Sequence, residues 1–481
     1  MTRRSDNLCK ALALALGMAC ASYSVTGFGD EPRHPATEAL SAPDAVVAAA
    51  DAGKGESPPR RDILFGDDAP VGRQKGRSSV GLRGFVQTEI ARTVSSPDHW
   101  SKMITRAELV ASGAFSEKVK WKLSGRVDYD AVYDLYDFYP PEVRKDQRLN
   151  FLARENYLDV AAGDWDFRLG RQQIVWGEIV GLFFADVVSA KDLREFILPD
   201  FEILRIPQWA ARAEYSKGDF HTELLWVPVA SYDEIGKPGA EFFPGPPPPP
   251  PGFATRFQGE IRPPRTLANT NYGARVSNLT NGWDMSAFYY RSVDNSPTFV
   301  RQIVAGVQPA FVYQARHDRI HQLGATVAKD FRSFVLKTEA VYTRGRQFNV
   351  MRLSDEDGVV RQDTFDWVVG FDFSLPKDTR LNLQVFQRAF LDHDPDIVPK
   401  QYESGYSVLL NHKLMDRLEG QVMWISSLNR GDWILRPSVN WGFEKNWRLR
   451  VGADVFHGPP LGFFGRFNNR DRVYTELRYS F

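Results

Sequence analysis

The sequence lacks three things that would place it in a familiar class: an excess of charge, a long apolar run, and cysteine beyond its first residues. Its 481 residues hold 60 Lys and Arg against 60 Asp and Glu, so no net charge draws the chain to nucleic acid. Beyond residue 22 no stretch of about 18 apolar residues is free of charge, which excludes a helical membrane protein. A soluble protein or a membrane β-barrel remains, because a barrel hides its membrane face in alternate residues.

Both cysteines, Cys9 and Cys20, lie in a segment typical of an export signal. A basic stretch, a short apolar run and an A-x-A cleavage site ending at Ala21 follow one another. Residues 1–21 are therefore predicted to be a signal peptide, and its removal leaves no thiol for catalysis or zinc binding. Acylation of Cys20, as in a lipoprotein, is the alternative, although Gly17 stands where a lipobox has leucine.

Residues 22–78 are predicted to be a disordered periplasmic tether. From Gly29 onward they are rich in Ala, Pro, Gly, Asp and Arg and show no apolar period. Only Arg60–Phe65 holds apolar residues worth burying. We interpret this stretch as a solvated linker, with docking on a partner or plugging of a barrel mouth as alternatives.

From residue 79 to residue 481 the apolar pattern has a period of two. In Val119–Ala131 one set of alternate residues is apolar, whereas the other set carries five charges. Because successive side chains of a strand point to opposite faces, one face of this strand is apolar and the other is charged. Similar segments recur at 366–374, 433–444 and 447–455, and aromatic residues at the strand ends predict interfacial girdles.

The connections between the strand candidates alternate between short and long. Short ones, such as Asn281-Gly282, carry residues that tight hairpins favour. Long ones are expected near 93–102, 131–150, 174–207, 229–270, 293–319, 344–364, 391–403 and 457–471. This alternation predicts an all-β fold, a transmembrane up-and-down antiparallel β-barrel of about 18 strands, with 16 as the alternative. The barrel is expected to span residues 79–481 and to lie in the outer membrane of a Gram-negative bacterium, among outer-membrane lipid.

The last residues of the chain have the alternating pattern of a β-strand, and this strand ends on an aromatic residue. Val473, Thr475, Leu477, Tyr479 and Phe481 share one face of it. This pattern resembles the signal that the barrel-assembly machinery reads in outer-membrane barrels. Leu477, Tyr479 and Phe481 are therefore the predicted assembly signal, and that machinery is a predicted partner.

The segment Ile174–Pro207 is too apolar for a loop that faces water on all sides. Within it, Ser189–Asp192 has the pattern of a capping box and predicts a short helix that Pro199 ends. We expect the loop to fold into the barrel and narrow its lumen. Its apolar side would lie against the wall or a hydrophobic substrate, and its charges would be paired. The alternative is a loop that only covers the barrel mouth.

Candidate channel-lining or constriction residues come from this loop and from the charged faces of the strands. The loop supplies Trp176, Glu178, Asp186, Asp192, Arg194, Glu195, Asp200 and Arg205, and the strands supply Lys120, Lys122, Arg126, Asp128, Asp130, Arg168, Arg171, Arg448 and Arg450. Two roles are open for these charges. Opposite charges across a lumen sort solutes by charge and dipole, or they pair with one another and solvate the interior.

The run Asp164–Glu178 resembles the hallmark of DUF1302, a bacterial outer-membrane β-barrel family of unknown function. The resemblance continues through Asp186–Val188, Asp192–Glu195 and Arg205–Pro207 to Ala213–Tyr215. It implies an outer-membrane barrel, often accompanied by a periplasmic lipid-binding-like lipoprotein and an exporter of the resistance-nodulation-division (RND) class. By analogy alone, it implies a channel or transporter-like barrel that moves hydrophobic or amphiphilic small molecules or lipids.

Signals for catalysis are few. The sequence has no nucleophile elbow, phosphate-binding loop or dinucleotide motif. His317 and His321 are four residues apart but lack a third ligand, and His393 stands between two aspartates in an expected loop. We therefore predict no enzyme activity, no cofactor and no metal. The alternatives to a channel are a docking platform for a periplasmic lipid carrier and, on weaker grounds, a membrane-embedded hydrolase.

Overall fold

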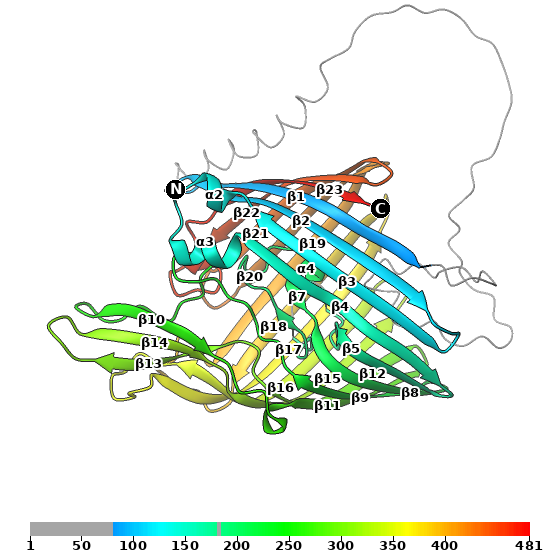
Figure 1. Ribbon diagram of the computed structural model, residues 1–481, viewed down its shortest axis with the longest axis horizontal. Coiled ribbons are helices and arrows are strands. Elements are labelled where there is room, and N and C mark those ends of the chain that lie inside the picture. Colours follow the sequence, from blue (N-terminus) through cyan, green and yellow to red (C-terminus); the bar gives the residue numbers. More distant parts are fainter. Residues whose placement is uncertain (1–79, 180–183) are drawn as a thin grey trace, which may run out of the picture. The chain divides into compact units, whose positions relative to one another are not determined.

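In the computed structural model, residues 80–179 and 184–481 are described, so the predicted signal peptide and tether lie outside the described residues. One antiparallel sheet of 18 strands makes up most of the described chain. Its first strand, β1 (Gly81–Thr93), pairs with its last, β23 (Arg472–Ser480), and this pairing closes the sheet into a barrel (Figure 1). The predicted fold class and the predicted strand number are confirmed.

The remaining strands of the barrel each pair with the strands that precede and follow them around the wall. They are β2 (His99–Ala114), β3 (Val119–Asp130), β4 (Leu149–Ala162), β5 (Trp165–Gln172), β8 (Gln208–Lys217), β9 (Phe220–Val229), β11 (Asn271–Thr280), β12 (Trp283–Val293), β15 (Arg319–Asp330), β16 (Val335–Asn349), β17 (Val359–Leu375), β18 (Thr379–Phe390), β19 (Tyr402–Met415), β20 (Leu418–Ser427), β21 (Trp433–Glu444) and β22 (Trp447–His457). Within the described ranges, no helix has the length and the apolar run that crossing a membrane requires.

Short turns gather at one end of the barrel and long connections at the other. Every predicted tight connection, from the β2–β3 turn to the β21–β22 turn, is a turn between paired strands. Asn281 and Gly282 have φ angles of 52° and 75°, as the central residues of a type I′ hairpin require. The start of β1 and the end of β23 both lie at the short-turn end, because an even number of strands returns the chain to its starting side.

The long connections contain the elements that are not part of the wall. These are α2 (Val132–Leu135), α3 (Pro141–Gln147), β6 (Ala190–Lys191), α4 (Phe201–Leu204), β7 (Arg205–Ile206), β10 (Ala254–Ile261), η3 (Leu267–Asn269), β13 (Thr298–Val304), β14 (Ala310–Arg316) and η4 (Gly465–Phe467). Strands β10, β14 and β13 form a separate three-stranded sheet that extends from the loop end of the barrel (Figure 1).

Two expected long loops are therefore more ordered than the sequence predicted. The stretches 229–270 and 293–319 supply the three-stranded sheet, whose rings of Phe299, Phe311 and Tyr313 are buried together. The long gap expected at 344–364 is also wrong in length. Strands β16 and β17 resume pairing beyond a bulge after Thr343, so the connection covers only residues 350–358.

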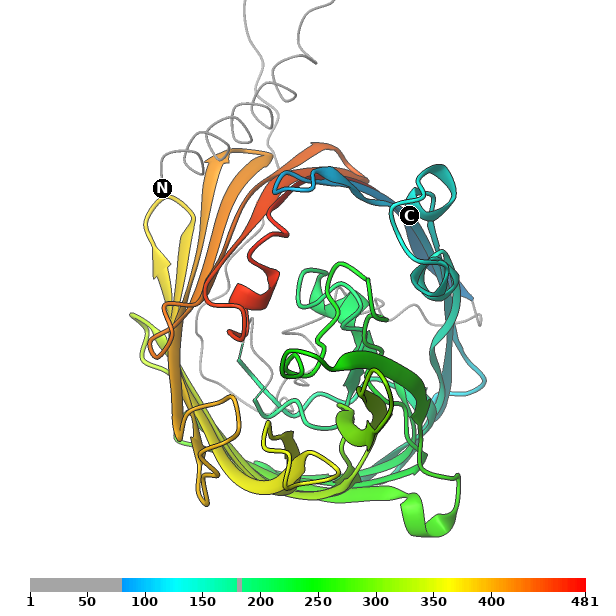
Figure 2. The same ribbon diagram turned by 90° about the vertical axis from the view of Figure 1, so that its left-hand side faces the viewer.

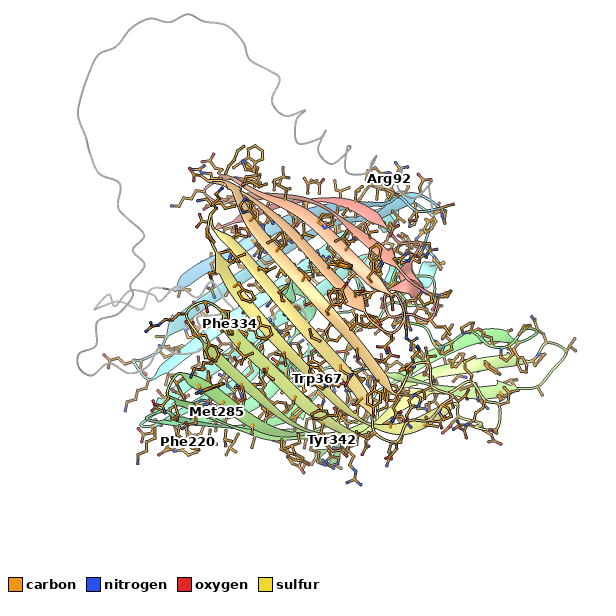
Figure 3. The ribbon with its side chains drawn as sticks, turned by 180° about the vertical axis from the view of Figure 1, so that it is seen from behind. Arg92, Phe220, Met285, Phe334, Tyr342 and Trp367 are labelled. Carbon is orange, nitrogen blue, oxygen red and sulfur yellow. The ribbon has the colours of Figure 1, made fainter. Side chains whose placement is uncertain are left out.

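The outer wall of the barrel is apolar, whereas the inner wall is polar. Leu123 on β3 exposes 54% of its surface, whereas Arg126, on the opposite face of the same strand, exposes 3%. In Figure 3, Met285, Phe334 and Trp367 lie on the outer face. Aromatic rings cluster beside the short turns, with 4.8 Å between the rings of Trp447 and Tyr479, 5.0 Å between Phe331 and Phe334, and 5.9 Å between Trp165 and Phe167. An apolar belt edged by aromatic rings is the outer surface that a membrane barrel requires.

At the seam where β1 pairs with β23, the space around Gly84 predicts that this position tolerates no side chain. A Cβ atom on Gly84 would lie 2.3 Å from the carbonyl oxygen of Glu108 and 2.9 Å from the ring of Phe481, whereas a Cβ on Gly81 would lie 3.5 Å from Ser112 Oγ. We expect Gly84→Val to lower the free energy of unfolding by about 1–3 kcal/mol. Urea titration in detergent micelles, followed by tryptophan fluorescence, measures the change. Gly81→Val is the matched control, and equal effects of the two substitutions would contradict the prediction.

Candidate functional site

The loop between β5 and β8, called here the crossing loop (residues 173–207), lies inside the ring of strands. Figure 2 looks into the barrel, and the segment that follows residue 184 runs within the ring. Side chains of this loop bond to β2 through Glu195 and to β22 through Asp200. Near its start, the loop bonds to Glu339 of β16. The crossing loop therefore spans the lumen and attaches to walls on several sides, so the predicted infolded loop is confirmed.

Trp176 anchors the first part of the crossing loop. Only 1% of this residue is exposed, and its indole Nε1 donates a hydrogen bond to Glu223 Oε1 of β9 at 2.9 Å. Its ring centroid lies 5.0 Å from that of Phe288 and 5.6 Å from that of Tyr290, both on β12. Gly273 of β11 leaves the space that the indole needs, since a Cβ there would lie 2.9 Å from the ring.

Glu339 of β16 acts as a buried receptor for the backbone of the loop. Its carboxylate accepts hydrogen bonds from the backbone N–H groups of Glu178, Ile179 and Ala185, the last two at 2.9 and 2.8 Å. Glu339 is itself 1% exposed. A buried carboxylate that accepts several N–H groups is stabilised by them, and in return it holds both ends of this loop segment against the wall.

The second part of the crossing loop packs against the opposite wall. Phe196 and Leu198 are buried with Ile425 of β20, Ile434 of β21 and Phe456 of β22. This cluster and the cluster around Trp176 together occupy the apolar side of the loop. Of the two partners that the sequence left open for this side, the barrel wall is the one in contact.

The charges of the loop are paired with charges of the wall. Glu195 accepts hydrogen bonds from Lys102 Nζ and Arg106 Nη2 of β2, whose side chains are 5% and 2% exposed. Glu89 of β1 binds Lys102 Nζ as well, at 3.0 Å. Two buried cations thus share one carboxylate from the loop and one from the wall, which offsets the large cost of burying them.

A second ion-paired contact lies farther along the loop. Asp200 Oδ1 accepts a hydrogen bond from Arg450 Nη1 of β22 at 2.9 Å, and Arg448 lies 3.7 Å from the same carboxylate. Arg436 Nη2 of β21 donates to the carbonyl oxygen of Leu198 at 2.6 Å. Glu476 of β23 accepts from Arg448 at 3.0 Å. Arginine guanidinium groups of the wall therefore bind both the side chain of Asp200 and the backbone of Leu198 in the loop.

Asp192 and Arg194 form an ion pair within the loop. Arg194 Nε and Nη2 donate to the two carboxylate oxygens of Asp192 at 2.8 and 2.6 Å, and Arg194 Nη1 donates to Asn150 Oδ1 of β4 at 3.0 Å. Burial alone would raise the pKa of the Asp192 carboxyl, but the charge and hydrogen bonds of Arg194 outweigh burial and lower it. The same balance, with Arg450 as the cation, lowers the pKa of Asp200.

A small polar cavity lies between this loop and the wall of β2 and β3. Its volume is about 40 Å³, enough for about three water molecules. Its lining includes the cations Lys102, Arg106, Arg126, Arg194 and Arg472 and the carboxylates Asp128, Asp130, Asp192, Glu195 and Glu241. Neither sign of charge predominates among the lining residues, so this space suits water or a small dipolar group better than a simple ion.

Most of the predicted channel-lining residues lie on the inner face of the barrel wall or on the crossing loop inside the barrel. The alternation of the strands required the inward positions on the wall. Lys122, Arg126, Asp128 and Asp130 share the inner face of β3; Arg168 pairs with Asp159 at 2.6 Å; and Arg205 pairs with Asp186 at 2.9 Å. Among the further charges of the lumen, Arg472 and Arg436 both bind Asp454. Pairing between charges is thus the observed arrangement.

Two expectations about particular positions are wrong. Arg171 shares its register with Trp209, which is exposed on the outer face, and alternation along β5 places it on the same side as the exposed Leu169. Lys120, in contrast, lies on the inner face of β3 in register with Asp159 and is exposed near the short-turn end. The predicted capping box opens no helix, because Ala190–Lys191 pairs with β7, and the short helix α4 follows Pro199 instead of ending there.

Sequence reasoning missed several residues that hold the loop. Lys102, Arg106, Glu339 and Arg436 were not singled out, although all four lie on strands of the barrel. On β2, the sequence of Lys102, Ile104, Arg106 and Glu108 at every second position was a usable signal for an inner face.

The histidines do not converge. His317 binds Glu260 at 2.7 Å, and His321 contacts Tyr289 Oη at 2.8 Å, so these two side chains have separate partners. His321 lies on β15. His393 contacts the carbonyl oxygen of Pro399 at 3.0 Å. Among residues 80–179 and 184–481, no group of three or more potential ligands could hold a metal ion.

The Glu339 receptor predicts how firmly the loop is held. Glu339→Gln replaces one accepting oxygen by an NH₂ group that cannot accept the loop N–H groups, so the attachment weakens by about 2 kcal/mol. We expect faster trypsin cleavage after Lys191 and Arg194 in the folded barrel. Glu356→Gln, which changes an exposed carboxylate in the β16–β17 connection, is the control. An unchanged cleavage rate in Glu339→Gln would show that this carboxylate does not fix the loop.

The lowered pKa of Asp192 predicts an acid-sensitive loop. A depressed folded-state pKa means that the stabilisation is present at neutral pH and is lost as pH falls below the ordinary value of 3.8, through the folded-state pKa. We expect protease sensitivity of the loop to rise between about pH 5 and pH 2.5, measured with pepsin. Asp192→Asn lacks the titrating group and should show a smaller rise, so an equal rise in both proteins would argue against Asp192.

Comparison with known proteins gives a family and a fold. A family model described as "Protein of unknown function (DUF1302)" matches residues 102–392. Among solved structures, OccAB1 of Acinetobacter baumannii is 9% identical, with a TM-score of 0.52 over 84% of this chain and 96% of that one. OccAB3 of the same organism is 8% identical, with a TM-score of 0.49 over 84% and 99%.

A third solved structure, OmpF of Salmonella typhi in complex with daunomycin, is 9% identical, with a TM-score of 0.42 over 84% of this chain and 98% of that one. At such identities a likeness shows the fold alone, and only the OccAB1 likeness is close enough to support it. None of the curated proteins matches.

Proposed function

The chain belongs to the DUF1302 family, and we propose that it is an outer-membrane conduit for small amphiphilic molecules. The observation that carries this proposal is the crossing loop, which narrows the barrel and is held by ion pairs on both sides. A barrel that served only as an anchor would not need a loop of this kind inside its lumen. A narrowed lumen lined by charges is the usual means by which a pore selects its solutes.

The apolar outer belt and the aromatic rims support a location in a membrane. The predicted signal peptide and the terminal aromatic strand support the outer membrane of a Gram-negative bacterium. In this orientation the short turns face the periplasm and the long loops face outward.

The chemistry of the lumen supports a particular class of solute. The apolar side of the crossing loop is already buried against the walls, so it offers little surface to a purely hydrophobic molecule. The side facing the cavity carries both signs of charge in similar number. We therefore favour amphiphilic molecules with a charged or zwitterionic group over the uncharged hydrophobic molecules and lipids that the family resemblance also allows.

The periplasmic lipoprotein and the RND-type exporter stay proposed partners, on the strength of the family resemblance. Together with the conduit they would make a route for amphiphiles across the cell envelope. A role as a docking platform for a lipid carrier would rest on the tether, which lies outside the described residues.

A flux assay tests the conduit. Glu195→Gln removes the charge that Lys102 and Arg106 share, which weakens the loop attachment by about 1.5–3 kcal/mol. We expect the passage of a small zwitterionic dye out of proteoliposomes to rise about tenfold or more, if the loop limits passage. Glu117→Gln, in the exposed β2–β3 turn, is the control and should behave as the unaltered protein does.

Two outcomes would contradict the proposal. One is the absence of dye passage above that of empty liposomes in both the unaltered barrel and Glu195→Gln. The other is equal passage in all three proteins, which would mean that the crossing loop does not control the lumen. A gel shift between boiled and unboiled samples shows in each case that the barrel is folded.

A further inference from the structure

The outer wall carries a basic patch that the proposed conduit does not use. It lies at the loop end of β12, β15 and β16. Arg291 of β12 is in register with Tyr272 of β11 and with His321 of β15, and His321 is in register with Arg344 of β16. Arg319 begins β15, two residues before His321. We call Arg291, Arg319, His321 and Arg344 the basic rim.

The side chains of the basic rim share the outer face of the barrel. Paired residues of an antiparallel sheet lie about 5 Å apart and point to the same side. On β15, Ile320 and Gln322 are buried on the inner side, whereas Leu323 is 58% exposed on the side of His321. Arg344 is exposed on the same face of β16. The four side chains therefore form one continuous surface, beside Tyr342, which Figure 3 labels.

The three arginines of the basic rim keep their positive charge. Among the described residues, no carboxylate forms an ion pair with Arg291, Arg319 or Arg344. Asp363, the acid nearest in register, instead accepts hydrogen bonds from Tyr342 Oη at 2.6 Å and the Gly345 N–H at 3.0 Å. Asp318, which precedes Arg319, is the other acid beside the rim. Three arginines thus lie beside two carboxylates without forming an ion pair with either among the described residues.

Arg92 provides a contrast on the same barrel. It lies at the loop end of β1 and faces outward, as the rim arginines do. Its guanidinium, however, is paired with Asp98 at 2.5 Å. An outward arginine at the loop end can therefore pair with a carboxylate of its own connection, whereas the rim arginines have no ion-pair partner among the described residues.

Neighbouring groups hold the rim side chains in place. The guanidinium of Arg291 lies 5.4 Å from the ring centroid of Tyr272. Arg319 Nη2 donates to the carbonyl oxygen of Ala268 at 2.7 Å, whereas its Nη1 is buried and has no hydrogen-bond partner in the described structure. His321 Nδ1 contacts Tyr289 Oη at 2.8 Å. Side chains that are already ordered lose less entropy when they bind a ligand.

Apolar surface adjoins the basic rim on the membrane side. Leu323 continues the outer face of β15 below His321, and Phe365 of β17 is exposed opposite Tyr342. A ligand that fits both surfaces has an anionic head and an apolar tail. Guanidinium groups match the oxygen geometry of phosphate, and tyrosine suits the boundary between lipid and water.

We propose that the basic rim binds the phosphate groups of an anionic lipid in the outer leaflet of the membrane. The phosphates bind Arg291, Arg319 and Arg344, and the acyl chains lie along Leu323 and Phe365. The lipid, and not free phosphate, is the ligand, because only the lipid uses the apolar surface next to the cations. This inference concerns the outer wall and does not depend on passage through the lumen.

Binding of a diphosphorylated glycolipid tests the proposal. The purified barrel in zwitterionic detergent is titrated with diphosphoryl lipid A, and bound lipid is counted by native mass spectrometry. The triple variant Arg291→Gln, Arg319→Gln, Arg344→Gln should bind about 100-fold more weakly, since each surface cation contributes about 1 kcal/mol. Arg92→Gln, which changes an arginine already paired with Asp98, should bind as the unaltered protein does.

Three results would overturn the proposal. They are equal lipid binding by the triple variant and the unaltered barrel, equal binding of the dephosphorylated lipid, and binding of inorganic phosphate as tight as that of the lipid. If the triple variant fails to fold, as judged by the boiled and unboiled gel positions, Arg344→Gln replaces it. This exposed single change should weaken binding about fivefold, and no change would equally overturn the proposal.

Discussion

Inside a membrane every backbone N–H and C=O group must find its partner within the protein, because lipid offers none. The closing pair β1 and β23 meets this demand, down to the two hydrogen bonds between Gly84 and Phe481 at 2.9 and 3.0 Å. Closure also fixes the direction of every side chain. With the outward positions given to apolar residues, the charged residues that alternate with them have only the interior to occupy.

The crossing loop belongs to the charge balance of that interior. Lys102 and Arg106 are buried on β2, and a buried cation without a partner is unstable. The carboxylate of Glu195 in the loop pairs with both cations, as the carboxylate of Asp200 pairs with Arg450. In return, Glu339 binds backbone N–H groups that a buried loop would otherwise leave unsatisfied. Wall and loop therefore stabilise each other.

The sequence alone was sufficient to predict the features of the fold that depend on the local pattern of residues. Period-two alternation, turn residues such as Asn281-Gly282 and the apolar content of Ile174–Pro207 predicted the barrel, its strand number and the infolded loop. It was insufficient wherever a partner comes from a distant strand, as with Glu339, because alternation gives a face but not a neighbour. Arg171 was misassigned although it stands three positions after the inward Arg168, so that alternation places it on the outer face. The capping-box residue Asp192 binds Arg194 instead of opening a helix.

The ends and the middle of the crossing loop differ in the sequence separation of the contacts that they make. Its ends sit on β5 and β8, which pair directly, but Asp200 meets Arg450 across 250 positions of sequence. Contacts of such separation form slowly until the intervening chain has been ordered. The wall must consequently be assembled before the loop can settle, so each newly made barrel passes through a stage in which its bore stands open.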